Sequence, residues 1–487
     1  MGQKGRMNMK NSIFQAWLIL LMFNGVVYGE SKDRLAITGA TIIDGTGNRP
    51  ISNGTILIEH GRITSVGKNR AITIPDNYKK IQARGKFLIP GLMDANLHLF
   101  LNIDLETLIK HEDRYHEIVI EAAQIALKTG QTTVFDTWGP RAALVKARDM
   151  INTGEVPGSR IYLAGNIIGF DGPLSADFRA QAAPFVSKAF VKSIEEAWVE
   201  NTGRSLLWMT PDEVRAIIKD YTGKGMDFLK YGASGHKDMN FISFSERVQR
   251  VIVEEGHRAG MTVQTHTTSV ESLDMAVEAG VDIVTHGGIS GPTTPIPDET
   301  IQKLVDREVA ISALAITQKR LDALIEHAPE STLTPYMKIQ KTNHENMIKA
   351  GVILLVSTDA GIQNPVLTAE SDNPSVLVDP RTKLGEGHFN ALLAFEERGM
   401  QPMEILKSAT SHIARAYELE DEIGTLESGK IADIVILDAN PLRNARNYRR
   451  IHSVIKNGQV VDLEALPVAP IISSMKVPDM KTDNETR

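Results

Sequence analysis

The sequence predicts an α/β protein, a TIM (β/α)8 barrel with a composite β-sandwich domain built from the two ends of the chain. Two observations predict this fold. Short apolar runs alternate with helical patterns through the middle of the chain, and strand-and-turn texture flanks them on both sides. Parallel strands need long helical crossovers, whereas antiparallel strands are joined by tight turns, so the two textures indicate two kinds of sheet.

The barrel is expected over residues 89–419. Thr210-Pro211-Asp212-Glu213 starts one of the intervening helices with a capping box and a proline at the first helical position. Residues 170–209 fit no regular unit and are interpreted as a long insertion after the third strand. Such alternation is typical of a TIM barrel, and a doubly wound sheet is the alternative. The eight strand-like runs cover residues 87–99, 132–138, 160–169, 226–235, 261–269, 281–288, 309–317 and 352–361.

The composite β-sandwich is expected over residues 30–88 and 420–465. Both segments contain alternating apolar strands broken by glycine-rich turns, and Asn457-Gly458 between two apolar runs is a strong hairpin signal. Residues 466–487 are interpreted as a loose C-terminal tail.

The N-terminus has the layout of a secretory signal peptide over residues 1–29. Lys4, Arg6 and Lys10 precede an apolar run, and the small residue Gly29 follows it. The mature protein is therefore expected to be periplasmic or secreted, without stable membrane association. An uncleaved anchor is the alternative, although the apolar run is short for a span of about 20 residues.

The composition excludes several classes of function. The formal net charge is −7 and no long basic run occurs, which argues against nucleic acid as a partner. There are no cysteines, so disulfides, thiolate metal sites and cysteine nucleophiles are excluded. The oligomeric state is left open.

Polar residues occur at the ends of several predicted barrel strands, where catalytic groups of such barrels lie. One histidine in such a place is usually a core residue, but the combination indicates a site. Neutral imidazole is the commonest protein metal ligand, and an aspartate can bind metal and accept a proton from water. A buried lysine is driven toward its neutral form, which can take up carbon dioxide as a carbamate. The residues are Asn96 and His98, Lys230, His266, His286 and Asp359.

This ordered set resembles the metal-dependent amidohydrolase superfamily. The resemblance implies one or two divalent metal ions, with zinc favoured over manganese or iron, held by Asn96, His98, Lys230, His266, His286 and Asp359. It also implies Lys230 and Asp359 as catalytic residues, Lys230 as a carboxylated bridge. "FLIPGLMDANLHL" resembles the family's first barrel strand, and "EIGTLESGKIADIVILDANPL" resembles its return into the β-sandwich.

Asn96 departs from the usual His-x-His pair of this superfamily. Asn96-Leu97-His98 resembles the Asn-x-His subgroup associated with phenylurea hydrolases, and "MDFLKYGASG" resembles prolidase-like and imidazolonepropionase-related members. An amide oxygen is a weaker donor than imidazole, so the first metal position is expected to be weakened. The alternative is that Asn96 does not bind metal and only one ion is held, beside Lys230, His266 and His286.

The resulting hypothesis is an exported hydrolase of a carbon–nitrogen bond in a small-molecule substrate, which is an amide, a urea, a carbamate or a dipeptide-like compound. Metal-activated water attacks, and Asp359 shuttles the proton. Tyr231, His236 and Trp138 are candidates to face the substrate. Two alternatives remain: an ester, lactone or phosphoester hydrolase on the same metal site, and a non-catalytic binding protein.

Overall fold

Eight parallel strands follow one another in chain order in the computed structural model, which describes residues 34–237, 239, 241–331, 333–369 and 378–476. They form a three-stranded sheet in the order β6-β7-β8 and a five-stranded sheet in the order β13-β12-β11-β10-β9. Their bounds are β6 Leu92–Leu97, β7 Gln131–Asp136, β8 Arg160–Leu163, β9 Leu229–Gly232, β10 Val263–His266, β11 Ile283–Thr285, β12 Ala310–Ala313 and β13 Leu354–Val356.

Backbone hydrogen bonds connect these two sheets at both edges. At one edge, the amide of Ile168 donates to the carbonyl of Lys230 over 2.8 Å, and that of Gly232 donates back to Ile168 over 3.0 Å. At the other edge, the amide of Asp359 donates to the carbonyl of Asn96 over 2.9 Å. This circular order is that of a (β/α)8 barrel and differs from the reversing order of a doubly wound sheet.

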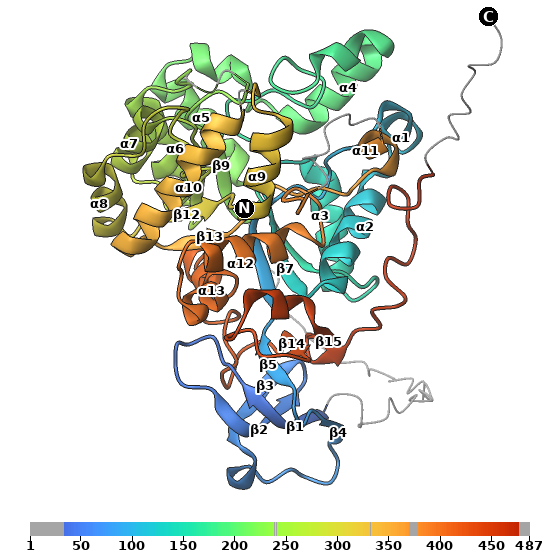
Figure 1. Cartoon of the computed structure of the whole chain (residues 1–487). Coiled ribbons are helices and arrows are strands. Elements are labelled where there is room, and N and C mark those ends of the chain that lie inside the picture. Colours follow the sequence, from blue (N-terminus) through green and yellow to red (C-terminus); the bar gives the residue numbers. More distant parts are fainter. Residues whose placement is uncertain (1–33, 238, 240, 332, 370–377, 477–487) are drawn as a thin grey trace, which may run out of the picture.

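Helices surround the parallel strands (Figure 1). The capping box predicted at Thr210 is present at the start of α5, with both of its hydrogen bonds formed. The helices are α1 Leu105–Lys110, α2 Tyr115–Lys128, α3 Arg141–Asn152, α4 Lys188–Val199, α5 Pro211–Thr222, α6 Glu246–Arg258, α7 Val270–Ala279, α8 Asp298–Asp306, α9 Gln318–His327, α10 Leu333–Ala350, α11 Pro365–Ala369, α12 Gly387–Glu397, α13 Pro402–Ser408 and α14 Ser411–Ala416; short 3-10 turns are η1 Asn69–Ala71, η2 Ala180–Phe185, η3 Arg204–Trp208 and η5 Ala445–Arg449.

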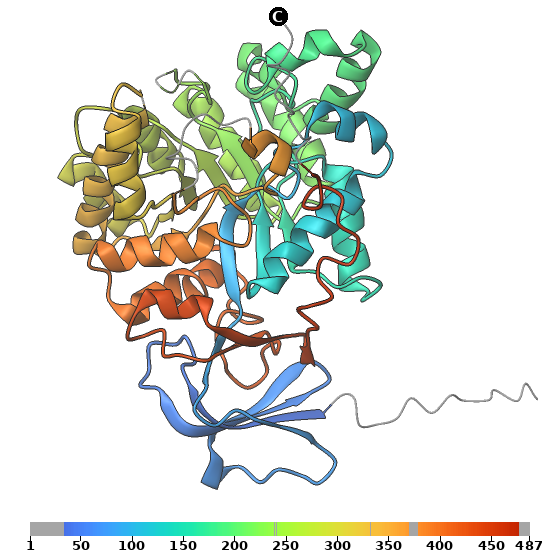
Figure 2. The same ribbon diagram turned by 45° about the vertical axis from the view of Figure 1, so that its right-hand side comes forward.

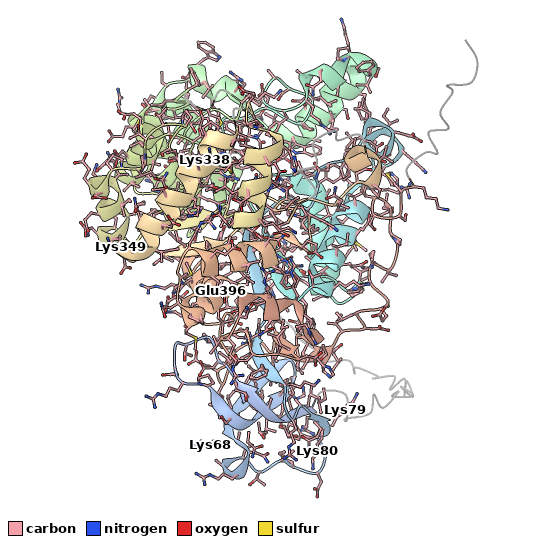
Figure 3. All side chains as sticks on the ribbon, in the orientation of Figure 1. Lys68, Lys79, Lys80, Lys338, Lys349 and Glu396 are labelled. Atoms are coloured by element: carbon pink, nitrogen blue, oxygen red, sulfur yellow. The ribbon has the colours of Figure 1, made fainter. Side chains whose placement is uncertain are left out.

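The remaining strands come from both ends of the chain and form one eight-stranded sheet. Its order is β16-β15-β14-β5-β1-β2-β3, with β4 paired to β1. In Figures 1 and 2 this sheet lies at one end of the molecule, and Figure 3 shows the exposed Lys68, Lys79 and Lys80 on it. The bounds are β1 Arg34–Ile42, β2 Ile51–Glu59, β3 Arg62–Lys68, β4 Lys79–Gln82, β5 Phe87–Pro90, β14 Ile434–Leu437, β15 Ile451–Lys456 and β16 Gln459–Val460.

The two ends also share one hydrophobic core, which contains Ile37, Ile56 and Leu88 together with Ile434 and Ile455. The sequence predicts a sandwich of this composition. In the described part of the chain, all the strands of this region are hydrogen-bonded into a single sheet instead of two separate ones.

The first predicted barrel strand, 87–99, is divided at Gly91. β5 pairs with β1 and β14 in the terminal sheet, whereas β6 pairs with β7 in the barrel. A side chain at Gly91 would overlap Thr132, so the close passage between the sheets requires glycine. β6 begins next to the terminal sheet, directly after β5. The carboxyl ends of the barrel strands therefore face away from that sheet (Figure 2).

Two sequence predictions concern the chain ends. The predicted signal peptide, residues 1–29, lies outside the described residues. In the described ranges, no helix is both long and apolar enough to cross a bilayer. The described part of the predicted tail is docked, because Glu121 of α2 accepts hydrogen bonds from the amides of Ile471, Ile472 and Ser473.

Candidate functional site

Three barrel strands bring an amide, a hydroxyl and an amine together at their carboxyl ends. Lys230 Nζ of β9 lies 3.0 Å from Asn96 Oδ1 of β6 and 3.0 Å from Thr137 Oγ1, one residue beyond β7. Thr137 Oγ1 also donates to Asn96 Oδ1. All three side chains are buried, so the amide oxygen of Asn96 is fixed toward the lysine.

Asp359 lies on the opposite side of the same amide, three residues beyond β13. Asn96 Nδ2 donates to Asp359 Oδ1 over 3.0 Å, and His98 Nε2 lies 3.0 Å from the same oxygen. The Asp359 side chain is 27% exposed, whereas that of His98 is 9% exposed. The carboxylate is therefore held by buried partners and remains open to an approaching water molecule.

His266 and His286 complete the group from β10 and from the residue after β11. Their ring centroids are 4.7 Å apart at an angle of 77°. Both are buried, and His266 Nε2 and His286 Nδ1 have no hydrogen-bond partner in the described structure. Buried polar atoms normally have a hydrogen-bond partner. These two unpaired ring nitrogens are therefore candidates to bind a metal ion.

The backbone is strained at two of these residues. His286 has φ 62° and Asp359 has φ 57°, both in the left-handed region that non-glycine residues rarely occupy. Such conformations cost about 1–3 kcal/mol each and cluster at functional sites. His286 directly follows β11, and Asp359 lies three residues after β13. Both strained residues therefore lie at the carboxyl ends of barrel strands, where the group assembles.

Burial sets the charge states of the group. It lowers the pKa of Lys230 to about 8 and that of His286 to about 3, and it holds the pKa of His266 well below its ordinary value. Burial alone would raise the pKa of Asp359, but the nearby His286, the hydrogen bond from His98 and the charge of Arg381 hold it well below its usual range. The site thus combines neutral imidazoles with an ionised carboxylate.

Two buried aspartates accept hydrogen bonds from residues next to Asp359 and His98. The sequence analysis did not identify them. Asp94 of β6 accepts from Thr358 Oγ1 over 2.6 Å, and Asp136 of β7 accepts from the amide of Leu99 over 2.6 Å. Burial raises the pKa of Asp94 to about 7 and that of Asp136 to about 8. Two signals were available in the sequence: Asp136 is the last residue of β7, and Asp94 shares a strand face with Asn96, two residues further along β6.

The three residues proposed to face the substrate have different positions. Tyr231 does not reach the site: its side chain is fully buried, and its hydroxyl donates to Gln249 Oε1 of α6 over 3.0 Å. The proposal for Tyr231 is therefore corrected, because successive strand residues point to opposite faces and Lys230 takes the inward one. Trp138 and His236 line a cavity beside the site.

The residues of this group are of types that bind metal ions, but they are not a cluster of carboxylates and imidazoles alone. In the part of the chain that the structure describes, no three His, Asp or Glu side chains form a metal site by themselves. The group includes an amide and a lysine instead, and the unpaired imidazole nitrogens of His98, His266 and His286 are suitable donors. The donor set therefore fits a divalent cation.

Parallel strands whose carboxyl ends carry neutral histidines, an ionised aspartate and a buried lysine define a hydrolytic enzyme of the barrel class. Residues 87–461 match the Amidohydrolase family model. The chain belongs to the amidohydrolase family, so the predicted family membership is confirmed, and members of this family generally depend on divalent metal.

Solved structures and known proteins refine this relationship. Molinate hydrolase is 36% identical and phenylurea hydrolase B 34% identical, with TM-scores of 0.87 and 0.86. Each comparison covers 91% of this chain. The matched part is 98% of the molinate hydrolase chain and 100% of the phenylurea hydrolase B chain. Ochratoxinase from Aspergillus niger is 24% identical over 446 residues, which are 87% of this chain and 85% of that protein. The chain is therefore a hydrolase of the group that acts on carbon–nitrogen bonds.

Proposed function

We propose that this protein hydrolyses a carbon–nitrogen bond in a small amide, urea, carbamate or dipeptide-like substrate at the site around Asp359. The supporting observation is the single hydrogen-bonded group formed by Asp359, His98, Asn96 and Lys230 next to two neutral histidines with unpaired nitrogens. The names of the relatives, phenylurea hydrolase B among them, agree with this substrate range.

Metal binding is assigned to His266, His286 and His98, with Lys230 and Asp359 completing the set and Asn96 as an additional ligand. A bound divalent cation, zinc being favoured over manganese or iron, polarises a carbonyl and lowers the pKa of water. His266 and His286 would hold one ion. A second ion requires Asn96 Oδ1 to exchange its hydrogen bonds from Lys230 and Thr137 for a metal bond.

Lys230 is proposed to carry a carbamate. Its amine is buried, and the lowered pKa makes the neutral form accessible near pH 8. The amine nitrogen forms a bond to the carbon of CO2 and releases one proton, which leaves an anionic carbamate. That anion would accept the hydrogen bond that Thr137 Oγ1 now donates to Asn96, and it would supply an anionic ligand for a bound cation.

Asp359 is proposed to accept the proton of the attacking water and pass it to the leaving nitrogen. It is ionised and partly exposed. His98 and Asn96 both donate to its Oδ1, which leaves Oδ2 available for the proton. Hydrolysis of an ester, lactone or phosphoester would use the same groups and is the second candidate.

The experiment is a hydrolysis screen of N-acyl amino acids, dipeptides, ureas and carbamates with added zinc or manganese. Lys230→Ala should abolish activity, and propionate should partly restore it by replacing the carbamate. Lys456→Ala is the matched control, because Lys456 is another buried lysine with a pKa of about 8 that lies next to Asp433 instead of the site. Full activity in Lys230→Ala would reject the carbamate, and cleavage of esters alone would favour the second candidate.

Export to the periplasm or medium is also proposed, from the basic and apolar layout of residues 1–29. N-terminal sequencing of the mature protein should find a start near Glu30. An intact N-terminus on membrane-bound protein would overturn this proposal.

A further inference from the structure

A cavity with a largely apolar wall adjoins the catalytic group. It has a volume of about 390 Å³ and is lined by the aromatic residues Phe100, Trp138, Phe178 and Trp198 and by apolar side chains such as Leu108. Trp138 and Phe178 stack with ring centroids 4.0 Å apart. A cavity of this size and composition is typical of a small-molecule site.

The wall of this cavity reaches the proposed metal ligands. The ring centroid of Trp138 lies 6.1 Å from that of His98, and that of His236 lies 6.0 Å from that of His266. His236 is itself fixed, since its Nδ1 is 2.9 Å from the carbonyl of Asp177. A substrate with its scissile bond at Asp359 can therefore place a neighbouring group in this cavity.

Arg179 is the charged residue in the cavity lining. Its Nη1 donates to the carbonyl of Ile103 over 2.8 Å, which uses one of the five guanidinium N–H groups. Within the described ranges it forms no ion pair. Asp104 is the acidic residue that acts on it electrostatically, but the Asp104 carboxylate accepts hydrogen bonds from Thr107 and Asn364.

Among the described residues, the lining contains no carboxylate that could neutralise Arg179. The indole N–H groups of Trp138 and Trp198 are buried and lack an acceptor in the described structure. A partly buried cation in an apolar wall is complementary to a ligand with an apolar body and an anionic acceptor group.

We propose that Arg179 binds the free carboxylate of the substrate and that the aromatic wall holds an apolar, ring-bearing side chain next to it. The substrate class is thus an amide or urea of an aromatic or large apolar amino acid with a free carboxylate. This inference rests on the proposed function and narrows its substrate range.

Binding is tested first, without catalysis, through the tryptophans of the cavity. The ligands are 3-phenylpropanoate and its neutral analogue 3-phenylpropanamide, titrated by intrinsic fluorescence. All proteins carry Trp208→Phe, because Trp208 is 90% exposed and lies outside the cavity lining. The acid should bind more tightly than the amide, and Arg179→Met should weaken its binding about ten- to a hundredfold, the loss of a charge-assisted hydrogen bond.

Two variants control this result. Arg179→Lys keeps the charge and should restore part of the affinity, and Arg250→Met removes an exposed arginine of α6 and should bind the acid like the parent protein. Equal binding of acid and amide, no binding of either, or unchanged binding of the acid to Arg179→Met would each overturn the assignment.

Hydrolysis is then compared for N-acetylphenylalanine and N-acetylphenylalaninamide in the metal-loaded enzyme. Arg179→Met should lower kcat/KM for the acid about ten- to a hundredfold and leave that for the amide nearly unchanged. Equal losses for both substrates would make Arg179 a structural residue. Arg179-dependent binding without cleavage of any carbon–nitrogen substrate would instead reject the proposed function.

Discussion

The buried ion pair between Arg160 and Asp433 should be a principal link between the barrel and the terminal sheet. Arg160 begins β8, and its Nη1 lies 2.6 Å from Asp433 Oδ2, one residue before β14. The side chains are 11% and 6% exposed. Asp433 Oδ1 also accepts from the amide of Asn457 over 2.8 Å, and Arg160 Nη2 donates to Asn457 Oδ1 over 2.5 Å.

Asp433→Asn keeps the volume but removes the negative charge and presents a donor to groups that are themselves donors. Breaking one partner of a buried, hydrogen-bonded pair costs about 3–5 kcal/mol, because the other charge stays buried without compensation. We therefore expect Asp433→Asn to lower the free energy of unfolding at pH 7 by about 3–5 kcal/mol. Urea denaturation followed by circular dichroism measures this loss.

The exposed pair Arg415 and Glu308 is the matched control. Their nitrogen and oxygen lie 3.2 Å apart, but the side chains are 62% and 72% exposed. Glu308→Gln should therefore cost at most about 1 kcal/mol. The double variant Arg160→Met/Asp433→Asn should lose less than the sum of its single variants, since neither partner of this pair is then left as a buried charge facing the other's empty place. A loss in Asp433→Asn as small as that in Glu308→Gln would refute the reasoning.

The same pair should show a defined pH dependence. Burial alone would raise the pKa of Asp433, but Arg160 and Lys456 hold it below its ordinary value. A depressed pKa in the folded state stabilises the protein fully above the unfolded value of about 3.9 and less as the pH falls through the folded value. The difference between wild type and Asp433→Asn should be constant from neutral pH to about pH 5 and shrink only in stronger acid.

Three further predictions concern the site and the docked C-terminal segment. Asp359→Asn should lower kcat at least about a hundredfold, as for loss of a general base, while metal content measured by plasma mass spectrometry falls less; a normal rate would place the base elsewhere. Asn96→Ala should lose one metal equivalent if the amide is a ligand, whereas one metal per chain in both proteins would reject the two-metal arrangement. Glu121→Ala should release the segment around Ile472 and speed proteolysis there, since three amides lose their acceptor; an unchanged digestion pattern would show that apolar packing alone holds it.

Sequence patterns predicted the barrel strands because each one combines a short apolar run with a turn. The division at Gly91 was not visible, because residues on both sides of it are equally apolar and only pairing separates β5 from β6. The docking of residues 466–476 was also missed. That segment has no periodicity of its own, and its order depends on the distant Glu121.

In the site, too, features set by neighbouring residues were predictable from the sequence, whereas features set by contacts between distant parts of the chain were not. Strand ends predicted Asn96, Lys230 and Asp359, and their side chains meet in the structure. Strand alternation would have excluded Tyr231, since its neighbour Lys230 already points inward. Arg179 had no local signal, because it lies in the insertion 170–209 and the role proposed for it depends on how that segment packs over the barrel. The residues proposed for the chemistry thus lie at strand ends, where a local signal exists, whereas the residue proposed for substrate choice lies in a loop, where sequence periodicity gives no guidance.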